Sequence, residues 1–154
     1  MEITVQIIYA STLGNTEFVV EKIAEYLQKR KVKVALCRAE LTDISVIKNN
    51  THFLFGTSTW NHGIINPYFD KLVSEMKNLN LDKKYAGFVG LGDHRYEEVL
   101  FCHGIEILED LFTKRGGKKI GSILKIDGDP FDQIDTVIKD WREDFFLKLK
   151  QTYV

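Results

Sequence analysis

The chain has 154 residues, of which 44% are hydrophobic and 28% are charged, and its formal net charge is -1. These values are typical of one globular domain spanning residues 1–154, and the near-neutral charge argues against a protein that binds nucleic acid or a membrane surface. No run approaches the ~18 apolar residues of a membrane span, and the first residues lack the basic and apolar regions of a secretory leader. We therefore expect a cytoplasmic protein.

Five short apolar runs rich in β-forming residues alternate along the chain with stretches of helical period. The runs predict strands at 3–9, 33–37, 52–56, 85–91 and 121–126. The other pattern predicts a first helix that closes at 29–31 and further helices at 42–48, 67–77, 101–115 and 130–150. Because strands joined by helices form parallel sheets with right-handed crossovers, we expect an α/β fold, a three-layer doubly wound sandwich around a five-stranded parallel sheet.

The cysteines and the charged segments give weaker indications. Cys37 and Cys102 form no metal-ligand spacing with each other or with the four histidines, so we expect reduced thiols and no metal site.

Residues 86–112 carry six acids against one arginine, and residues 127–144 carry seven acids against two basic residues. If these segments share a face, that face would suit a basic partner, but solvated helix surfaces explain the same charges equally well.

The loop after the first predicted strand is a candidate phosphate site. Ligands of doubly wound sheets bind beyond the carboxyl ends of the strands, and here the N–H groups and hydroxyls of the loop converge at a helix N-terminus. An ordinary capped helix start explains the loop equally well, and the loop has neither the lysine of a Walker motif nor the glycines of a dinucleotide-binding motif. Its residues are Ser11, Thr12, Leu13, Gly14, Asn15 and Thr16.

The loops after the third and fourth predicted strands each carry a large aromatic residue. Trp60 lies in the loop 56–63, where an indole is unfavourable unless a flat ligand covers it or it folds back on its own domain. Tyr96 lies in the loop 90–98, whose glycines would let backbone amides approach the edge of a ligand. Together the loops predict a phosphate at the first and an aromatic ring held between Trp60 and Tyr96.

Three motifs in these loops resemble those of the short-chain flavodoxins. They are Ser-Thr-x-Gly-Asn-Thr after the first strand, Thr-Trp after the third and Gly-Asp-x-x-Tyr-Glu after the fourth, and the resemblance covers essentially the whole chain. It implies the flavodoxin-like strand order 2-1-3-4-5 and non-covalent FMN as the cofactor. It also implies a monomeric, low-potential one-electron carrier that is not itself an enzyme. Its partners would be a flavodoxin or ferredoxin reductase and acceptor proteins, without nucleic acid or membrane.

The resemblance also implies which residues hold FMN. The first loop and Ser58 would bind the phosphate, Thr59 and the third loop would hold the ribityl chain and the pyrimidine edge, and Trp60 and Tyr96 would flank the ring. Leu13 departs from the family pattern, in which a hydroxyl residue is frequent. The implied residues are Ser11, Thr12, Leu13, Gly14, Asn15, Thr16, Ser58, Thr59, Trp60, Asn61, His62, Gly63, Leu91, Gly92, Asp93, Tyr96 and Glu97.

The sequence is also compatible with two other functions and with a raised reduction potential for the second electron. An FMN-dependent reductase would take hydride from NADH or NADPH on the same fold, and a ribonucleotide-reductase activator of flavodoxin-like fold would use the same cofactor. Fast turnover of a nicotinamide cofactor without a partner protein would favour the reductase. His62, His94 and Arg95 are cationic candidates near the ring that either raise the potential of the second electron or point into water.

Overall fold

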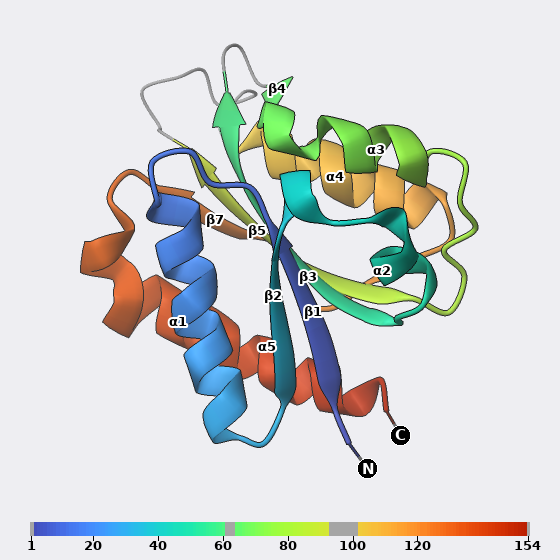
Figure 1. Ribbon diagram of the computed structural model, residues 1–154. Helices are drawn as coiled ribbons and strands as arrows, with labels where there is room; N and C mark the ends of the chain where they lie inside the picture. The colour runs from blue at the N-terminus through green and yellow to red at the C-terminus, as the bar shows by residue number, and fades with distance from the viewer. Residues whose placement is uncertain (1, 61–63, 93–101, 154) are drawn as a thin grey trace.

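The computed structural model describes residues 2–60, 64–92 and 102–153 of the chain (Figure 1). Within these residues one sheet holds the strands in the order β2-β1-β3-β5-β6, with β4 on β3 and β7 on β5. All of its pairings are parallel except that of β3 with β4, which is antiparallel. The strands are β1 (Thr4–Tyr9), β2 (Lys33–Arg38), β3 (His52–Trp60), β4 (Ile64–Ile65), β5 (Tyr85–Gly92), β6 (Lys118–Lys119) and β7 (Leu124–Asp127).

The predicted α/β fold and the order 2-1-3-4-5 are confirmed, but the number of strands is not. The predicted fifth strand, 121–126, corresponds to β7, which begins at Leu124, and a separate short strand, β6, precedes it; β6 pairs with the start of β5 and β7 with its end. Gly121 turns the chain between them at φ +71°, a left-handed conformation that a regular strand does not contain. The short strand β4, which the sequence did not predict, folds back on the end of β3 and extends that strand to Trp60.

Helices cover both faces of the sheet (Figure 1). The helices α1 (Asn15–Lys29) and α5 (Lys139–Gln151) lie on one face, and α3 (Asp70–Met76) and α4 (His103–Lys114) lie on the other. Each face has its own buried apolar cluster, as expected of a parallel sheet covered on both sides. Shorter helical segments are η1 (Ala39–Leu41), α2 (Ile44–Lys48), η3 (Pro67–Phe69), η5 (Pro130–Gln133) and the π-helical η6 (Ile134–Ile138).

The two Asx-Pro helix starts of the sequence are caps in the structure. Asn66 accepts a hydrogen bond from the backbone N–H of Tyr68 at 3.0 Å, and Asp129 accepts one from Phe131 at 2.9 Å. The helices that follow are less regular than predicted, because each begins as a 3-10 turn. The expected helix 67–77 consists of η3 and α3, and the expected helix 130–150 consists of η5, η6 and α5. Cys37 and Cys102 are both free thiols, as predicted.

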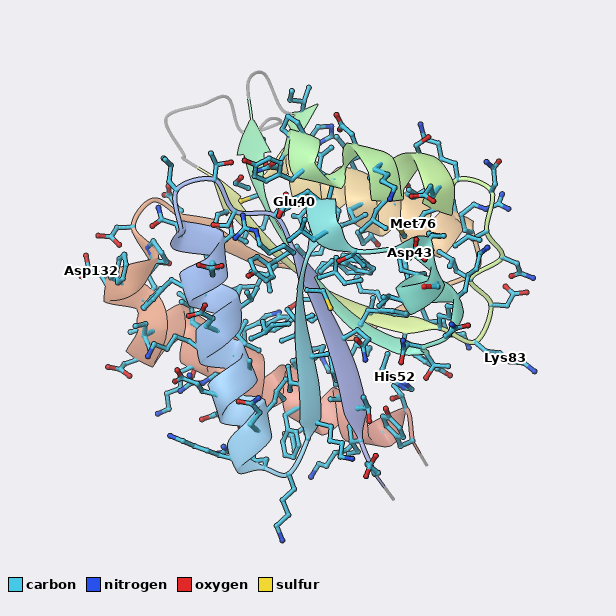
Figure 2. The ribbon with its side chains drawn as sticks, viewed as in Figure 1. Glu40, Asp43, His52, Met76, Lys83 and Asp132 are labelled. Carbon is cyan, nitrogen blue, oxygen red and sulfur yellow. The ribbon has the colours of Figure 1, made fainter. Side chains whose placement is uncertain are left out.

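His52 lies at the start of β3, at the edge of the sheet opposite the candidate loops (Figure 2). Its ring is stacked between Tyr85 and Tyr153, with centroids 5.1 and 4.2 Å away. The hydroxyl of Thr152 donates to Leu149 O at 2.6 Å, so its oxygen accepts from His52 Nε2 at 2.9 Å, and Nδ1 accepts from Thr51. Burial lowers the pKa of His52 below its ordinary value of 6.5.

We expect acid to destabilise the protein through His52. Because its pKa is lower in the folded than in the unfolded state, its contribution is present above pH 6.5 and is lost as the pH falls below that value. Urea unfolding at a series of pH values should therefore give a shallower acid slope for His52→Gln than for the wild type. Identical slopes for the wild type and His52→Gln would contradict the assignment.

Candidate functional site

The turn between β1 and α1 leaves the N-terminus of a long helix without a side-chain cap. Gly14 occupies the cap position at φ +94°, and within the described ranges no side chain accepts from the first turn of α1. Its own N–H donates to Ser11 Oγ at 3.1 Å, and Ser11 and Thr16 are both buried. By contrast α2, η3 and η5 each begin with an Asp or Asn that accepts from the first turn. The free N–H groups of α1 therefore suit an anion.

A buried amide joins this turn to the end of β3. The side chain of Asn66 is 0% exposed, and its Nδ2 donates to Thr12 Oγ1 at 3.1 Å and to Ser58 Oγ at 3.2 Å. Its Oδ1 accepts from Tyr68 N. Thr12 lies in the turn after β1 and Ser58 lies near the end of β3, so one residue holds both hydroxyls at the same edge of the sheet. That edge is the one at which α1 begins.

Helix α4 starts against the same end of β3. The backbone N–H of Gly104 donates to Thr59 Oγ1 at 2.9 Å. A Cβ atom at Gly104 would lie 3.0 Å from Ser58 O and 3.1 Å from Thr59 Oγ1, closer than such contacts normally are. The glycine therefore allows the helix to approach the strand this closely. This contact joins the start of α4, which follows the third loop along the chain, to the end of β3.

The end of β5 completes the described part of the site. Leu91 is the register partner of Ser58, which places the start of the third loop directly beside the second. On the other side, Gly92 accepts a hydrogen bond from Gly128 N at 3.0 Å, next to the end of β7. Both residues lie at the carboxyl edge of the sheet, where ligands of doubly wound folds bind.

Arg38, the last residue of β2, donates a hydrogen bond to the backbone of the first loop. Its Nη2 donates to Ser11 O at 2.7 Å, and its other nitrogens contact Glu17 at 3.1 Å and Glu40 at 2.6 Å. Figure 2 shows Glu40 on η1, beside this loop. Glu17 also accepts from the hydroxyl of Tyr9 at 2.7 Å; burial, and secondarily this carboxylate, raise the pKa of Tyr9 to about 12. The one cation bound to the described part of the loop is thus paired with two carboxylates.

The structure gathers part of the expected site at one edge of the sheet and leaves part of it undescribed. The gathered residues are Ser11, Thr12, Gly14, Asn15, Thr16, Ser58, Thr59, Leu91 and Gly92. Leu13 lies in the same turn, but its side chain is 91% exposed. The side chain of Trp60 lies outside the described residues, as do Asn61, His62, Gly63, Asp93, His94, Arg95, Tyr96 and Glu97.

Sequence reasoning missed three residues that build this site. Asn66, Gly104 and Arg38 are not among the residues that the sequence predicts for the site. No local pattern marks their second contacts, because Asn66 and Thr12 are 54 residues apart and Arg38 and Ser11 are 27 apart. Only an assumed strand order could have brought β2 and η3 to the first loop.

The part of the chain that the structure describes contains no group of metal-ligating side chains. A search of the same residues finds no helix with the length and apolar character needed to cross a bilayer.

Comparison with known proteins places this geometry in a family. The family model for flavodoxin matches residues 7–141. A flavodoxin from Maridesulfovibrio salexigens is 36% identical over 129 residues, which cover 80% of this chain and 86% of that protein. The crystal structure of oxidised flavodoxin 2 from Bacillus cereus superimposes with a TM-score of 0.87 at 27% identity, over 94% of this chain and 99% of the other.

A further solved structure has the same fold and contains a ligand. It is the flavodoxin of Fusobacterium nucleatum bound to flavin mononucleotide, with a TM-score of 0.78 at 21% identity, over 96% of this chain and 98% of that one. The family match spans most of the chain, and the sequence identity to a flavodoxin extends over four fifths of it. The chain therefore belongs to the flavodoxin family.

Proposed function

We propose that this chain carries single electrons on a non-covalently bound FMN. The observation that carries the proposal is the uncapped N-terminus of α1, with the hydroxyls of Thr12 and Ser58 held at the same edge of the sheet. Helix N-termini of this kind bind phosphate, because their N–H groups point at the ligand and the helix dipole favours negative charge. FMN bound to a flavodoxin of the same fold adds support.

The first loop fits a phosphate without a cation of its own. Thr12 and Ser58 offer hydroxyl protons, and the first turn of α1 offers N–H groups from Asn15 and Thr16. Leu13 can contribute only its backbone, because its side chain has no hydrogen-bonding group and is exposed to solvent. Gly14 turns the chain at a positive φ that a side chain would strain. Neutral donors in a fixed geometry would therefore hold the anion.

The remaining residues of the proposed site would enclose the ring and its chain. Thr59 would hold the ribityl hydroxyls, and Trp60 and Tyr96 would cover the two faces of the ring and exclude water from it. The bound FMN supplies the one-electron chemistry. Leu91, Gly92 and the undescribed residues Asn61, His62, Gly63, Asp93 and Glu97 would line the ring edge.

We also propose an oligomeric state, a location and partners for the chain. It is proposed to act as one domain over residues 1–154, as a monomer in the cytoplasm, between a reductase of the flavodoxin or ferredoxin type and acceptor proteins. A low potential follows if the aromatic faces and nearby acids disfavour the negative charge of the fully reduced ring. We propose that the chain carries electrons between proteins and is not itself an enzyme.

Stepwise reduction of the purified full-length protein tests the proposal. We expect a yellow protein that releases FMN on denaturation and develops a long-wavelength absorbance near one electron per flavin, which disappears at two. A colourless protein that binds no added FMN would contradict the proposal. Fast oxidation of NADH or NADPH without any partner protein would instead support the reductase alternative.

We expect Arg38→Ala to weaken FMN binding by about tenfold. The substitution removes the donor to Ser11 O and leaves Glu17 and Glu40 without their cationic partner beside the phosphate loop. Charge-assisted hydrogen bonds of this kind contribute about 1.5–3 kcal/mol each. Fluorescence titration of the flavin-free protein with FMN measures the effect. Arg30→Ala is the control, because Arg30 contacts the ring of Tyr26 at the other end of α1. Equal losses in the two variants would show that the effect is not local.

A further inference from the structure

Asn66 makes two hydrogen bonds besides the one that caps η3. Its amide is fully buried, and each of its polar groups has a partner: Oδ1 accepts from Tyr68 N, and the two protons of Nδ2 go to Thr12 Oγ1 and Ser58 Oγ. The N–H of Tyr68 can only donate, so the oxygen of the amide must face it. The NH₂ group must therefore face the two hydroxyls.

This orientation decides where the hydroxyl protons point. Each hydroxyl has a single proton, and the oxygen of each accepts from Asn66. The proton of each is therefore directed away from Asn66. Within residues 2–60, 64–92 and 102–153, neither Thr12 Oγ1 nor Ser58 Oγ donates to another protein group in a hydrogen bond of the structure. As far as the described residues go, both protons are thus available to a bound acceptor.

We propose that Asn66 is a positioning residue that presents the hydroxyl protons of Thr12 and Ser58 to the flavin phosphate and so sets the preference for FMN over the unphosphorylated flavin. The inference rests on the proposed function, because it concerns the phosphate of that same ligand. Asn66 does not touch the phosphate; it acts through the two hydroxyls. A helix cap alone would need only the oxygen of the amide, whereas Nδ2 donates to Thr12 Oγ1 and Ser58 Oγ.

An Asn66→Asp substitution tests the direction of the hydroxyl protons. The carboxylate still accepts from Tyr68 N, so the cap is kept, but the two hydroxyls must now donate to it and turn their protons away from the ligand. We expect the dissociation constant for FMN to rise about 10- to 100-fold, as for a charged group that loses its hydrogen bonds. The dissociation constant for riboflavin, which has no phosphate, should stay within about twofold.

Asn50→Asp is the matched control. The Asn50 amide is likewise used at both ends, since Nδ2 donates to Val46 O at 2.8 Å and Oδ1 accepts from Gln6 Nε2 at 3.4 Å. It precedes β3 and so lies at the opposite edge of the sheet. The exchange adds the same charge and removes the same kind of donor, and the ratio of FMN to riboflavin affinity should remain that of the wild type. A matching change in this ratio in both variants would overturn the inference.

Asn66→Ser separates positioning from charge and from any failure of the aspartate variant to fold. Serine can still cap η3 but is too short to reach both hydroxyls, so FMN affinity should fall while riboflavin affinity does not. In a chain that already carries Thr12→Ala and Ser58→Ala, the same substitution should have no further effect on FMN affinity. A full additional loss in that background would show a merely structural role and overturn the inference.

The wild type distinguishes failure of this inference from failure of the proposed function. If the unmodified protein binds FMN no better than riboflavin, the phosphate site itself is wrong and both proposals fall. If it prefers FMN and the Asn66 variants keep that preference, only the role of Asn66 is overturned. Fluorescence titration of flavin-free full-length protein with each flavin gives all of these constants.

Discussion

Replacement of Thr12 by aspartate is expected to weaken FMN binding by about 100-fold or more. The substitution exchanges a hydroxyl donor for a carboxylate at the point where Asn66 holds the first loop. Like charges held close together near a protein surface repel each other by roughly 3–4 kcal/mol, which corresponds to about two to three orders of magnitude in a dissociation constant. Titration of the flavin-free protein with FMN measures the loss, and titration with riboflavin should show little change.

Leu13→Asp is the control for Thr12→Asp. It places the same charge one residue along the chain, but the side chain at that position is 91% exposed and points into water. Solvent and salt screen a charge of that kind, so we expect a loss of about tenfold or less. An equal loss in the two variants would indicate a general effect of loop charge. It would contradict a phosphate bound specifically at Thr12 and Ser58.

Replacement of Phe55 by alanine is expected to lower the free energy of unfolding by about 3–5 kcal/mol. The ring is fully buried in β3, with centroids 5.8 Å from Phe53, 5.7 Å from Phe88 and 5.8 Å from Phe112. Its removal takes away apolar contacts on several sides at once and leaves a cavity that neighbouring rings cannot fill. Urea unfolding followed by circular dichroism measures the difference.

Phe131→Ala provides the comparison on the surface. Its ring contacts Phe18 with a centroid distance of 4.1 Å, yet the residue is 54% exposed. We expect a loss of about 1 kcal/mol or less, because little apolar area returns to water. If Phe55→Ala destabilised the protein no more than Phe131→Ala, the cluster of Phe55 with its three neighbouring rings would not be the main core on its face of the sheet.

Three acids of α4 are paired with lysines in the structure. The acids of α4 do not form a uniformly negative face, because each of three acids has a lysine partner. Glu106 is 3.5 Å from Lys125, Glu109 is 3.9 Å from Lys119, and Asp110 is 2.8 Å from Lys114. Lys119 and Lys125 come from the chain after the helix, so a count over residues 86–112 could not include them. For these three acids, the charge count over residues 86–112 therefore leaves out the lysines that the fold places beside them.

The order of the elements could be predicted because its causes are local. Apolar runs of strand length, stripes of helical period and the caps Asn66 and Asp129 each depend on a few neighbouring residues, and parallel strands with right-handed crossovers then allow few topologies. The separate strand β6 and the late start of β7 could not be predicted in the same way. They depend on how residues 121–123 leave the edge of β5, which a short sequence pattern does not encode.

The residue types of the first loop predict an anion site from the sequence alone, because small hydroxyl residues and a glycine at a helix start can supply hydrogen-bond donors to an anion. Only the tertiary structure decided which groups complete the site. Asn66 reaches Thr12 across 54 residues, Gly104 reaches Thr59 across 45, and Arg38 reaches Ser11 across 27. Such contacts follow from the packing of β2, η3 and α4 around one edge of the sheet, and a hydrogen bond forms only where packing brings donor and acceptor within about 3 Å.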